Sequence, residues 1–406
     1  MILAALLGCG GDPTIGLAPP DATDSAAELP SAPDDTAEPD DTGDTAEPDE
    51  DFGCSPLFAQ DRLPVYEVTI EERDWHHLQT EWRTADGTKD YFPITELRVD
   101  GEVVPDAEIR LKGNSSCCWL GDKMQFVVAF NEVNEVARFQ GERKIALDSP
   151  FYDPTVLKNR LASWYLLRQG LPAACTNSAL LYVNGEFYGL YANMEELDHE
   201  FLERNFGKDN ADGYLWKYGT VLDNHEGEEV DYTRINDFWS SYDPAYTTTF
   251  GDVDQWMTEW AAEAVLPDGD GYWCCGHNYY LYDHPEQGMM WIPWDMDGTF
   301  DWVGYDISPD YLYYPDYTPH MAYILASDEG HAAFVEHVAA ATDLYGTPEM
   351  LSALDDMIAQ TAEWSAQDPY RYYDQATYET SLADLHPYVE NRRGWLDAWL
   401  AAQPAP

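Results

Sequence analysis

Two aspartates in the C-terminal half of the chain stand directly after an apolar stretch. Asp295 follows the apolar run at 289–293, and Asp297 comes two residues later. Carboxylates at this spacing are catalytic residues, the ligands of a calcium loop, or turn residues that cap backbone amides. The EF-hand pattern is not met, because Phe300 takes the place of the turn glycine and Asp306 stands at the twelfth position. The place directly after an apolar strand favours catalysis.

Cations near such segments are informative, because the whole chain has only 21 Lys and Arg residues. Arg110 and Lys112 alternate with apolar neighbours, which places both on one face of a strand. There they either cradle phosphate or pair with some of the abundant carboxylates. Lys123 stands beside Asp122 after the turn at Gly113, and it is either a functional lysine or half of a surface salt bridge.

Alternating and helical patterns indicate which elements position these residues. An Asn184-Gly185 pair between two apolar runs predicts a β-hairpin with a type I′ turn. Asp153 before Pro154 predicts the start of a helix that Gly170 ends. Further strands are predicted at 63–70, 92–99, 103–112, 124–130, 213–218, 277–282 and 289–293. Further helices are predicted at 71–81, 198–205, 251–266, 332–342, 348–367 and 381–402.

Composition indicates a globular chain and argues against one class of partner. Hydrophobic residues make up 45% and aromatic residues 14% of the 406 residues, which is enough for a sizeable core. The formal net charge is -55. Because a nucleic-acid-binding protein needs clustered cations, we expect no nucleic acid partner. A strand-rich part followed by a helix-rich part predicts an α+β fold with two lobes.

The first residues are typical of an exported protein. Leu6-Leu7-Gly8-Cys9 is similar to a bacterial lipobox, so we expect residues 1–8 to be part of a lipoprotein signal and Cys9 to carry a membrane-anchoring lipid. The alternative is a short apolar leader with a stray cysteine. Residues 12–52 hold 14 acidic residues and no Lys or Arg. This composition predicts a disordered acidic linker over 9–53, followed by one folded domain over 54–406.

Six cysteines remain after Cys9, and an even number in an exported protein predicts disulfides. Two vicinal pairs stand among them, and we expect these pairs to join neighbouring loops. A zinc site is the rival interpretation, but the C-x-x-C spacing of thiolate sites is absent. The six are Cys54, Cys117, Cys118, Cys175, Cys274 and Cys275.

Four blocks of the chain together resemble the CotH kinase family, a family of atypical protein kinases related to spore coat protein H. The first is Ile109 to Ser116 with Lys123, and the second runs from Leu181 through the Asn-Gly turn to Asp198. The third is Asn278 to Tyr282 followed by Ile292 to Asp297, and the weaker fourth is Asn391-Arg392-Arg393 in the last helix. The blocks keep the family's order and cover roughly residues 60 to 400.

The resemblance implies roles for residues of a phosphoryl-transfer site. Asp295 looks like the metal-binding aspartate, with Asn278 as a second ligand and Asp297 beside them. Asp270 looks like the carboxylate that orients or deprotonates the acceptor hydroxyl. Asp268 lies in the same Gly-rich loop, and the choice between these two aspartates stays open.

The same resemblance implies the groups that bind nucleotide. Lys123 corresponds to the lysine that contacts ATP phosphates, and Arg110 and Lys112 help to cradle them. Glu195 orients Lys123, contacts the nucleotide, or simply initiates a helix. The implied cofactors are ATP with Mg²⁺ or Mn²⁺.

The implied function is an ATP-dependent protein kinase that phosphorylates Ser or Thr hydroxyls of an exported or surface protein at the bacterial cell envelope. One rival is a catalytically inactive surface protein with the same architecture. Another is an acidic module that binds cations or glycans. The natural substrate and the oligomeric state are not predictable from the sequence.

Overall fold

The computed structural model describes residues 52–84, 89–113, 121–149, 152–224, 230–301, 304, 306–307 and 316–403. These residues belong to one compact unit, Asp51–Pro406. All elements described below lie within that unit.

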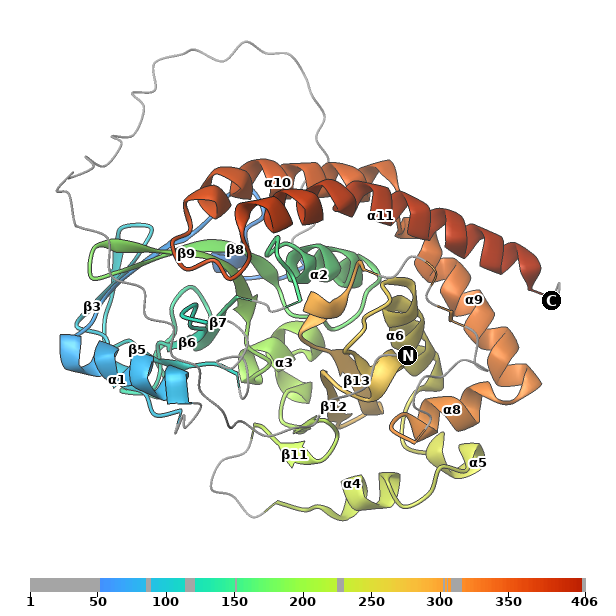
Figure 1. Ribbon diagram of the computed structural model, residues 1–406. Helices are drawn as coiled ribbons and strands as arrows, with labels where there is room; N and C mark the ends of the chain where they lie inside the picture. Colours follow the sequence, from blue (N-terminus) through green and yellow to red (C-terminus); the bar gives the residue numbers. More distant parts are fainter. Residues whose placement is uncertain are drawn as a thin grey trace, which may run out of the picture. The chain divides into compact units, whose positions relative to one another are not determined.

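Strands dominate the first half of the unit and form one sheet of nine strands in the described residues (Figure 1). Their spatial order is β2-β5-β6-β7-β9-β8-β1-β3-β4, and β1 and β8 pair in parallel while the other neighbours are antiparallel. The strands are β1 (Val65–Thr69), β2 (Phe92–Pro93), β3 (Glu96–Val99), β4 (Glu102–Val104), β5 (Glu108–Leu111), β6 (Phe126–Ala129), β7 (Lys144–Asp148), β8 (Thr176–Val183) and β9 (Glu186–Glu195).

The centre of this sheet is buried on both faces, because different groups of side chains cover each face. Tyr191 of β9 packs with one core, which includes Leu78 from α1 (Glu72–Thr84). Its neighbour Leu190 points the other way and packs with Phe201 from α3 (His199–Phe206). The alternation of side chains along a strand therefore distributes β9 between two cores.

A second, smaller sheet opens the other half of the unit. Its order is β11-β10-β12-β13, with β10 (Tyr214–Lys217), β11 (Val221–Leu222), β12 (Tyr279–His284) and β13 (Gly288–Pro293). Helix α6 (Val253–Val265) packs on β13, and a group of buried aromatic rings joins them. The rings of Trp260 and Tyr272 stack with centroids 6.2 Å apart, and Trp291 lies 4.1 Å from Tyr272.

Helices make up most of the remainder. They are α2 (Lys158–Arg168), α4 (Thr233–Phe238), α5 (Pro244–Thr247), α7 (Tyr272–Cys275), α8 (Pro319–Leu325), α9 (Asp328–Leu344), α10 (Pro348–Gln367) and α11 (Gln375–Ala402). Helices α10 and α11 lie side by side, and α10 crosses over β9 (Figure 1). Arg392 of α11 is fully buried and donates to the carbonyls of Ala264 and Val265, at 2.7 and 3.3 Å. It thereby satisfies carbonyl groups that the end of α6 leaves without helical partners.

The α+β prediction is confirmed, since a strand-rich part precedes a helix-rich part. The Asn184-Gly185 hairpin is also confirmed, with positive φ at both turn residues. The helix predicted to begin at Pro154 begins instead at Lys158. Asp153 still accepts from the Lys158 amide at 2.7 Å, but a turn of four residues separates the two. None of the helices in the described part has the length and apolar character needed to cross a membrane.

Two disulfides occur among the described residues. Cys54 is bonded to Cys175, and Cys274 is bonded to its neighbour Cys275. The expectation that Cys274 and Cys275 join a neighbouring loop is therefore wrong. The other vicinal pair, Cys117-Cys118, lies outside the described residues.

Candidate active site

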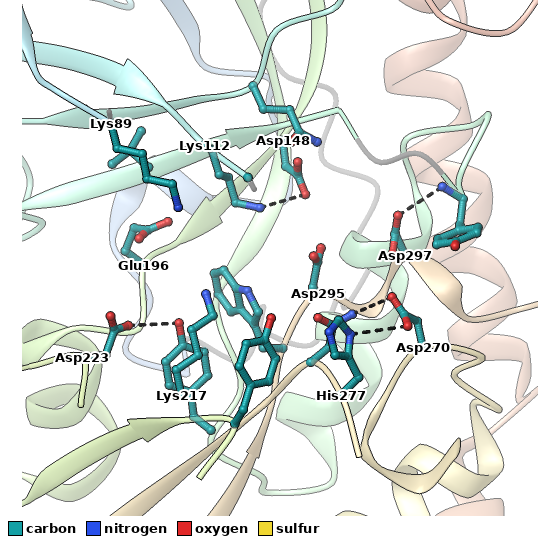
Figure 2. A pocket seen from close by; sticks show the side chains of 18 of the residues that line it. Lys89, Lys112, Asp148, Glu196, Lys217, Asp223, Asp270, His277, Asp295 and Asp297 are labelled. Atoms are coloured by element: carbon teal, nitrogen blue, oxygen red, sulfur yellow. Dashed lines mark hydrogen bonds and ion pairs between the residues drawn. The ribbon is translucent and has the colours of Figure 1, made fainter. Parts of the chain in front are cut away.

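A polar cavity of about 540 Å³ lies where the large sheet faces the small one (Figure 2). Strands β5, β6 and β7 contribute one wall, and β10, β12 and the segments that flank β12 and β13 contribute the other. Its lining residues are Lys89, Arg110, Lys112, Gly113, Gln125, Val127, Asp148, Tyr152, Glu196, Lys217, Tyr218, Asp223, Asp270, His277, Asn278, Tyr280, Trp294, Asp295 and Asp297.

Four cations line this cavity: Lys89, Arg110, Lys112 and Lys217. Arg110 lies on β5 and Lys112 directly follows that strand, and both reach the cavity because they are two residues apart along an extended chain. The Lys112 ammonium lies 3.3 Å from Asp148 and 5.7 Å from the ring centre of Trp294. Burial lowers the pKa of Lys112, but the carboxylates of Asp148, Asp295 and others outweigh this effect and raise it above its usual value. Lys112 is thus a permanently charged group at the centre of the site.

Two further cations of the cavity form no ion pair with the described carboxylates, although the chain has 76 acidic residues. Arg110 donates to the Leu111 carbonyl and lies over the Tyr91 ring, and Lys217 lies over the rings of Tyr218 and Tyr280. Burial and the neighbouring charges of Arg110 and Lys217 lower the pKa of Lys89. Like charges held together in this way are typical of an anion-binding site.

Six carboxylates also line the cavity. Figure 2 shows Asp295 between Lys112 on one side and Asp270 and Asp297 on the other, while Glu196 and Asp223 lie near Lys89 and Lys217. Asp148 and Asp297 are almost fully buried. Burial and the nearby Asp295 raise the pKa of Asp148 to about 6, against the effect of Lys112. Burial, followed by Asp295 and Asp148, raises the pKa of Asp297 well above its usual value. So many carboxylates in one place repel one another, and a bound cation would relieve that repulsion.

Three cavity residues have a left-handed backbone, with φ of 44° at Asn278, 57° at Asp295 and 52° at Tyr218. Asn and Asp tolerate this conformation, whereas an aromatic residue adopts it rarely. Strained conformations of this kind gather at functional sites. The backbone conformation at Asn278 and Asp295 sets the direction in which each side chain leaves the main chain.

The two aspartates of the Gly-rich loop have different surroundings. Asp270 lines the cavity, accepts from the Asn278 amide at 3.2 Å and lies 3.4 Å from the His277 ring. Asp268 has no exposed surface and accepts from the Asp270 amide at 3.0 Å. A Cβ at Gly298 would lie 2.5 Å from the Asp268 carboxylate, so Asp268 packs closely against the segment that follows Asp297. Asp270 is therefore the aspartate that an acceptor can reach.

Two residues predicted to bind nucleotide lie elsewhere. Lys123 is buried outside the cavity lining, and its ammonium lies 2.6 Å from Asp368. Glu195 accepts from Arg204 at 2.6 Å and from the Cys175 amide at 2.8 Å. The lysine that lies beside the cavity carboxylate Asp148 is Lys112. The glutamate that lines the cavity is Glu196, which directly follows β9.

Several cavity residues were not singled out from the sequence. Asp148 ends the apolar strand β7 in the same manner as Asp295 follows β13, and that pattern could have found it. Glu196 lies one position from Glu195 and so on the other side of the chain. Lys89, Asp223 and His277 lie in connecting segments, where no periodic pattern marks them.

The donor set fits a hard divalent cation. Mg²⁺ in phosphoryl-transfer sites is usually held by one or two carboxylates together with substrate phosphates. Asp295, Asp297 and Asn278 offer such oxygens in the cavity that the four cations also line. No group of three or more His, Cys, Asp and Glu side chains in the described part of the chain is arranged to hold a metal ion.

Comparison with known proteins identifies the class to which this fold and site belong. The family model described as CotH kinase protein matches residues 109–396, more than half of the chain, so the chain belongs to that family. It is similar to the inner spore coat protein H of Bacillus subtilis strain 168, with 22% identity over 368 residues that cover 83% of this chain and 97% of that protein. The family resemblance seen in the sequence is confirmed.

Two solved structures are similar at a lower level. One is the Helicobacter pylori proinflammatory kinase CtkA, with 10% identity, a TM-score of 0.28, and coverage of 78% of this chain and 94% of that chain. The other is the HipA–HipB toxin–antitoxin system of Shewanella oneidensis MR-1 with operator DNA, with 15% identity, a TM-score of 0.22, and coverage of 64% and 61%. Both TM-scores lie below 0.5, so neither structure supports an argument about this chain.

Proposed function

We propose that this chain is a protein kinase that transfers the γ-phosphoryl group of ATP to a Ser or Thr hydroxyl of an exported or surface protein. The observation that carries the proposal is that one cavity is lined both by cations and by a group of carboxylate and amide oxygens, those of Asp270, Asn278, Asp295 and Asp297. Phosphoryl transfer needs these two sets of charges side by side, because phosphates bind cations and their metal ions bind carboxylates.

The four cations of the cavity would bind the phosphates of the nucleotide. Lys112 is held in place by Asp148 at 3.3 Å, and Arg110 and Lys217 form no ion pair with the described carboxylates that an arriving phosphate would have to displace. Asp295, Asn278 and Asp297 would hold Mg²⁺ or Mn²⁺. The ion supplies positive charge that neutralises the phosphate oxygens.

Asp270 is the group proposed to act on the acceptor. Its side chain keeps 37% exposure in the cavity, and the Asn278 amide and the His277 ring orient it. The acceptor oxygen forms a bond to the γ-phosphorus, the bond to the bridging oxygen of ADP breaks, and the hydroxyl proton passes to Asp270. The hydrogen bond to Asp270 is the first cause of the raised pKa of His277.

Export of the chain with a lipid on Cys9 belongs to the same proposal. A relative that is a spore coat protein and a Cys54–Cys175 disulfide both support a location outside the reducing cytoplasm. The protein substrate would then be another exported or surface protein. No partner of this chain is present in the structure.

Labelled ATP tests the proposal. The purified full chain is incubated with γ-labelled ATP, Mg²⁺ or Mn²⁺, and Ser- and Thr-rich proteins, and transfer of label to protein is expected. Asp295→Asn and Asp270→Asn should each lower the rate by about 100-fold or more, equivalent to about 2.7 kcal/mol of the barrier. Asp122→Asn is the matched control, because Asp122 pairs with Arg83 at the surface outside the cavity lining.

The rival functions give different results in the same experiment. Binding of ATP without transfer to any protein, or to the chain itself, would favour an inactive surface protein. Binding of Ca²⁺ or glycans without ATP binding would favour the acidic surface module. Label transfer that survives Asp295→Asn would place the catalytic site elsewhere.

A further inference from the structure

Two glutamates on helix α6 carry carboxyl groups in the dry interior, outside the cavity. Glu259 and Glu263 are one helical turn apart, and neither has any exposed surface. Burying an ionised carboxylate is costly unless it is paired or hydrogen-bonded. An unusual arrangement of this kind therefore needs a structural reason.

Glu263 holds the backbone of the loop that carries Asp270 and Asn278. Its carboxyl oxygens accept from the amides of Tyr272 and Trp273, at 3.4 and 2.7 Å. These amides open α7, which follows Asp270 by two residues and ends three residues before Asn278. A single side chain on a rigid helix thus fixes the middle of the loop.

Glu259 lies one helical turn before Glu263 on α6, and after burial the charge of Glu263 is the next cause of its raised pKa. Neither carboxyl oxygen of Glu259 accepts a hydrogen bond from another described group. The other titratable groups that face the pair are the Tyr272 hydroxyl and Asp268, and no cation faces it among the described residues. Two adjacent buried carboxylates without a cation do not both ionise, so at least one of the two keeps its proton.

We infer that Glu259 and Glu263 form a proton-sharing pair that positions Asp270 and Asn278 through the backbone of α7. In this pair Glu259 is neutral and donates to Glu263, and the charge of Glu263 is stabilised by the two backbone amides. The inference rests on the proposed kinase function, because the positioned residues are those of the phosphoryl-transfer site. Neither glutamate lines the cavity, so both act as positioning residues.

The shared proton makes the pair sensitive to pH. Burial raises the pKa of Glu259 well above its usual value, and it raises the pKa of Glu263 to about 7 against the two backbone amides. A raised carboxyl pKa contributes stability that is fully present below the unfolded value of about 4.5 and is lost as the pH rises through the folded value. The contribution of Glu263 is therefore lost between about pH 4.5 and 7, and that of Glu259 is lost as the pH rises from about 4.5 through its own raised pKa.

Glu263→Gln and Glu259→Gln test the inference as a matched pair of nearly isosteric changes. A glutamine at 263 offers one acceptor for two amides and turns its own NH₂ group toward one of them. We expect hydrogen exchange at the Tyr272 and Trp273 amides to accelerate by about 10-fold or more, and kcat to fall by about 10- to 100-fold with KM for ATP changed less than about 2-fold.

A glutamine at 259 donates to Glu263 as a neutral carboxyl group does. We expect Glu259→Gln to keep the slow exchange of the two amides and to remove only the part of the pH-dependent loss of stability that comes from Glu259, because burial still raises the pKa of Glu263. Unchanged amide exchange in Glu263→Gln would overturn the inference. So would equal effects of the two substitutions on exchange, because a purely space-filling role predicts no difference between them.

The exchange measurement also separates this inference from the proposed function. If the wild-type chain transfers no phosphate, the kinase proposal fails, while amide exchange at Tyr272 and Trp273 still decides whether Glu263 holds the loop. If transfer is observed and exchange is unchanged in Glu263→Gln, only the positioning inference fails.

Discussion

Lys123 is held by two kinds of interaction at once. Its ammonium lies 2.6 Å from Asp368 and 4.1 Å from the centre of the Tyr191 ring, and the side chain keeps 1% exposure. Burial lowers its pKa, and Asp368 acts in the opposite direction. Asp368 also accepts from the Leu190 amide at 2.9 Å, so the pair joins the end of α10 to β9. Lys123 thus has a structural role, because its ion pair connects α10 with β9.

Lys123→Met should therefore destabilise the protein without affecting the cavity directly. Removal of one partner from a buried ion pair leaves the other charge unpaired, at a cost of about 3–5 kcal/mol. Denaturant unfolding followed by tryptophan fluorescence measures the loss. The double change Lys123→Met with Asp368→Leu should restore part of it, because no charge is then left buried alone.

Lys112→Met is the contrasting substitution. It removes the lysine that faces Asp148 and Asp295, so it should weaken the binding of ATP with Mg²⁺ by about 10-fold or more. ATP affinity measured by calorimetry separates the two lysines. Weaker ATP binding in Lys123→Met at a temperature where that variant is folded would contradict the assignment.

The period of a strand explains which site residues the sequence could supply. Arg110 and Lys112 share a face because they are two positions apart, and both line the cavity. Glu195 and Glu196 are one position apart, and the family pattern does not say which of them faces the nucleotide side. For Lys123 only a place after a turn could be predicted, and its partner Asp368 is 245 residues away. Contacts at such separations depend on the whole fold.

At the scale of elements, β9 passes very close to the Lys123–Asp368 pair. A Cβ at Gly189 would lie 1.9 Å from the Lys123 ammonium and 2.5 Å from Asp368, and Gly189 has a φ of 145°. Only glycine leaves room for the ion pair here. The β-bulge between Leu181 and Tyr182 lies opposite Gly189 and accommodates the irregular backbone.

Gly189→Ala should consequently destabilise the protein more than a matched change at Gly185. Gly185, in the turn between β8 and β9, also has a positive φ, but a Cβ there meets nothing within 4 Å. Gly185→Ala should cost about 1–2 kcal/mol from backbone strain alone. Gly189→Ala should add about 1–3 kcal/mol from overpacking. Equal unfolding midpoints for the two variants would show that the close approach is absent in solution.

Elements with strong local signals were predictable, and those without them were not. The hairpin of β8 and β9 follows from its Asn-Gly turn, and α10 follows from the helical pattern over 348–367. Strand β7 was missed because only its three central residues, 145–147, are apolar, and a run this short that is buried on both faces shows no alternation. Since β7 supplies Asp148, the missed strand and the missed site residue have one cause.

At the scale of the whole molecule, the few cations have a marked distribution. Most Lys and Arg residues of this chain pair with carboxylates, for example Arg143 with Glu200 and Lys158 with Asp301. The cavity nevertheless collects four of them, Lys89, Arg110, Lys112 and Lys217. Six carboxylates line the same cavity, so in a chain with a net charge of -55 the cavity is a place where cations are concentrated beside carboxylates.

The Cys54–Cys175 disulfide acts on the same scale, because it joins the beginning of the folded unit to the residue before β8 across 121 positions. Closing a loop of this length in the unfolded chain stabilises the folded state by about 2–5 kcal/mol.

Reduction of the Cys54–Cys175 disulfide should lower the melting temperature by several degrees. The variant Cys54→Ala with Cys175→Ala should melt at the temperature of the reduced wild type, and Cys274→Ala with Cys275→Ala should not. The second variant is needed because a reductant also opens the Cys274–Cys275 bond. If reductant leaves the melting temperature of wild type unchanged, the long-range bond contributes nothing to stability.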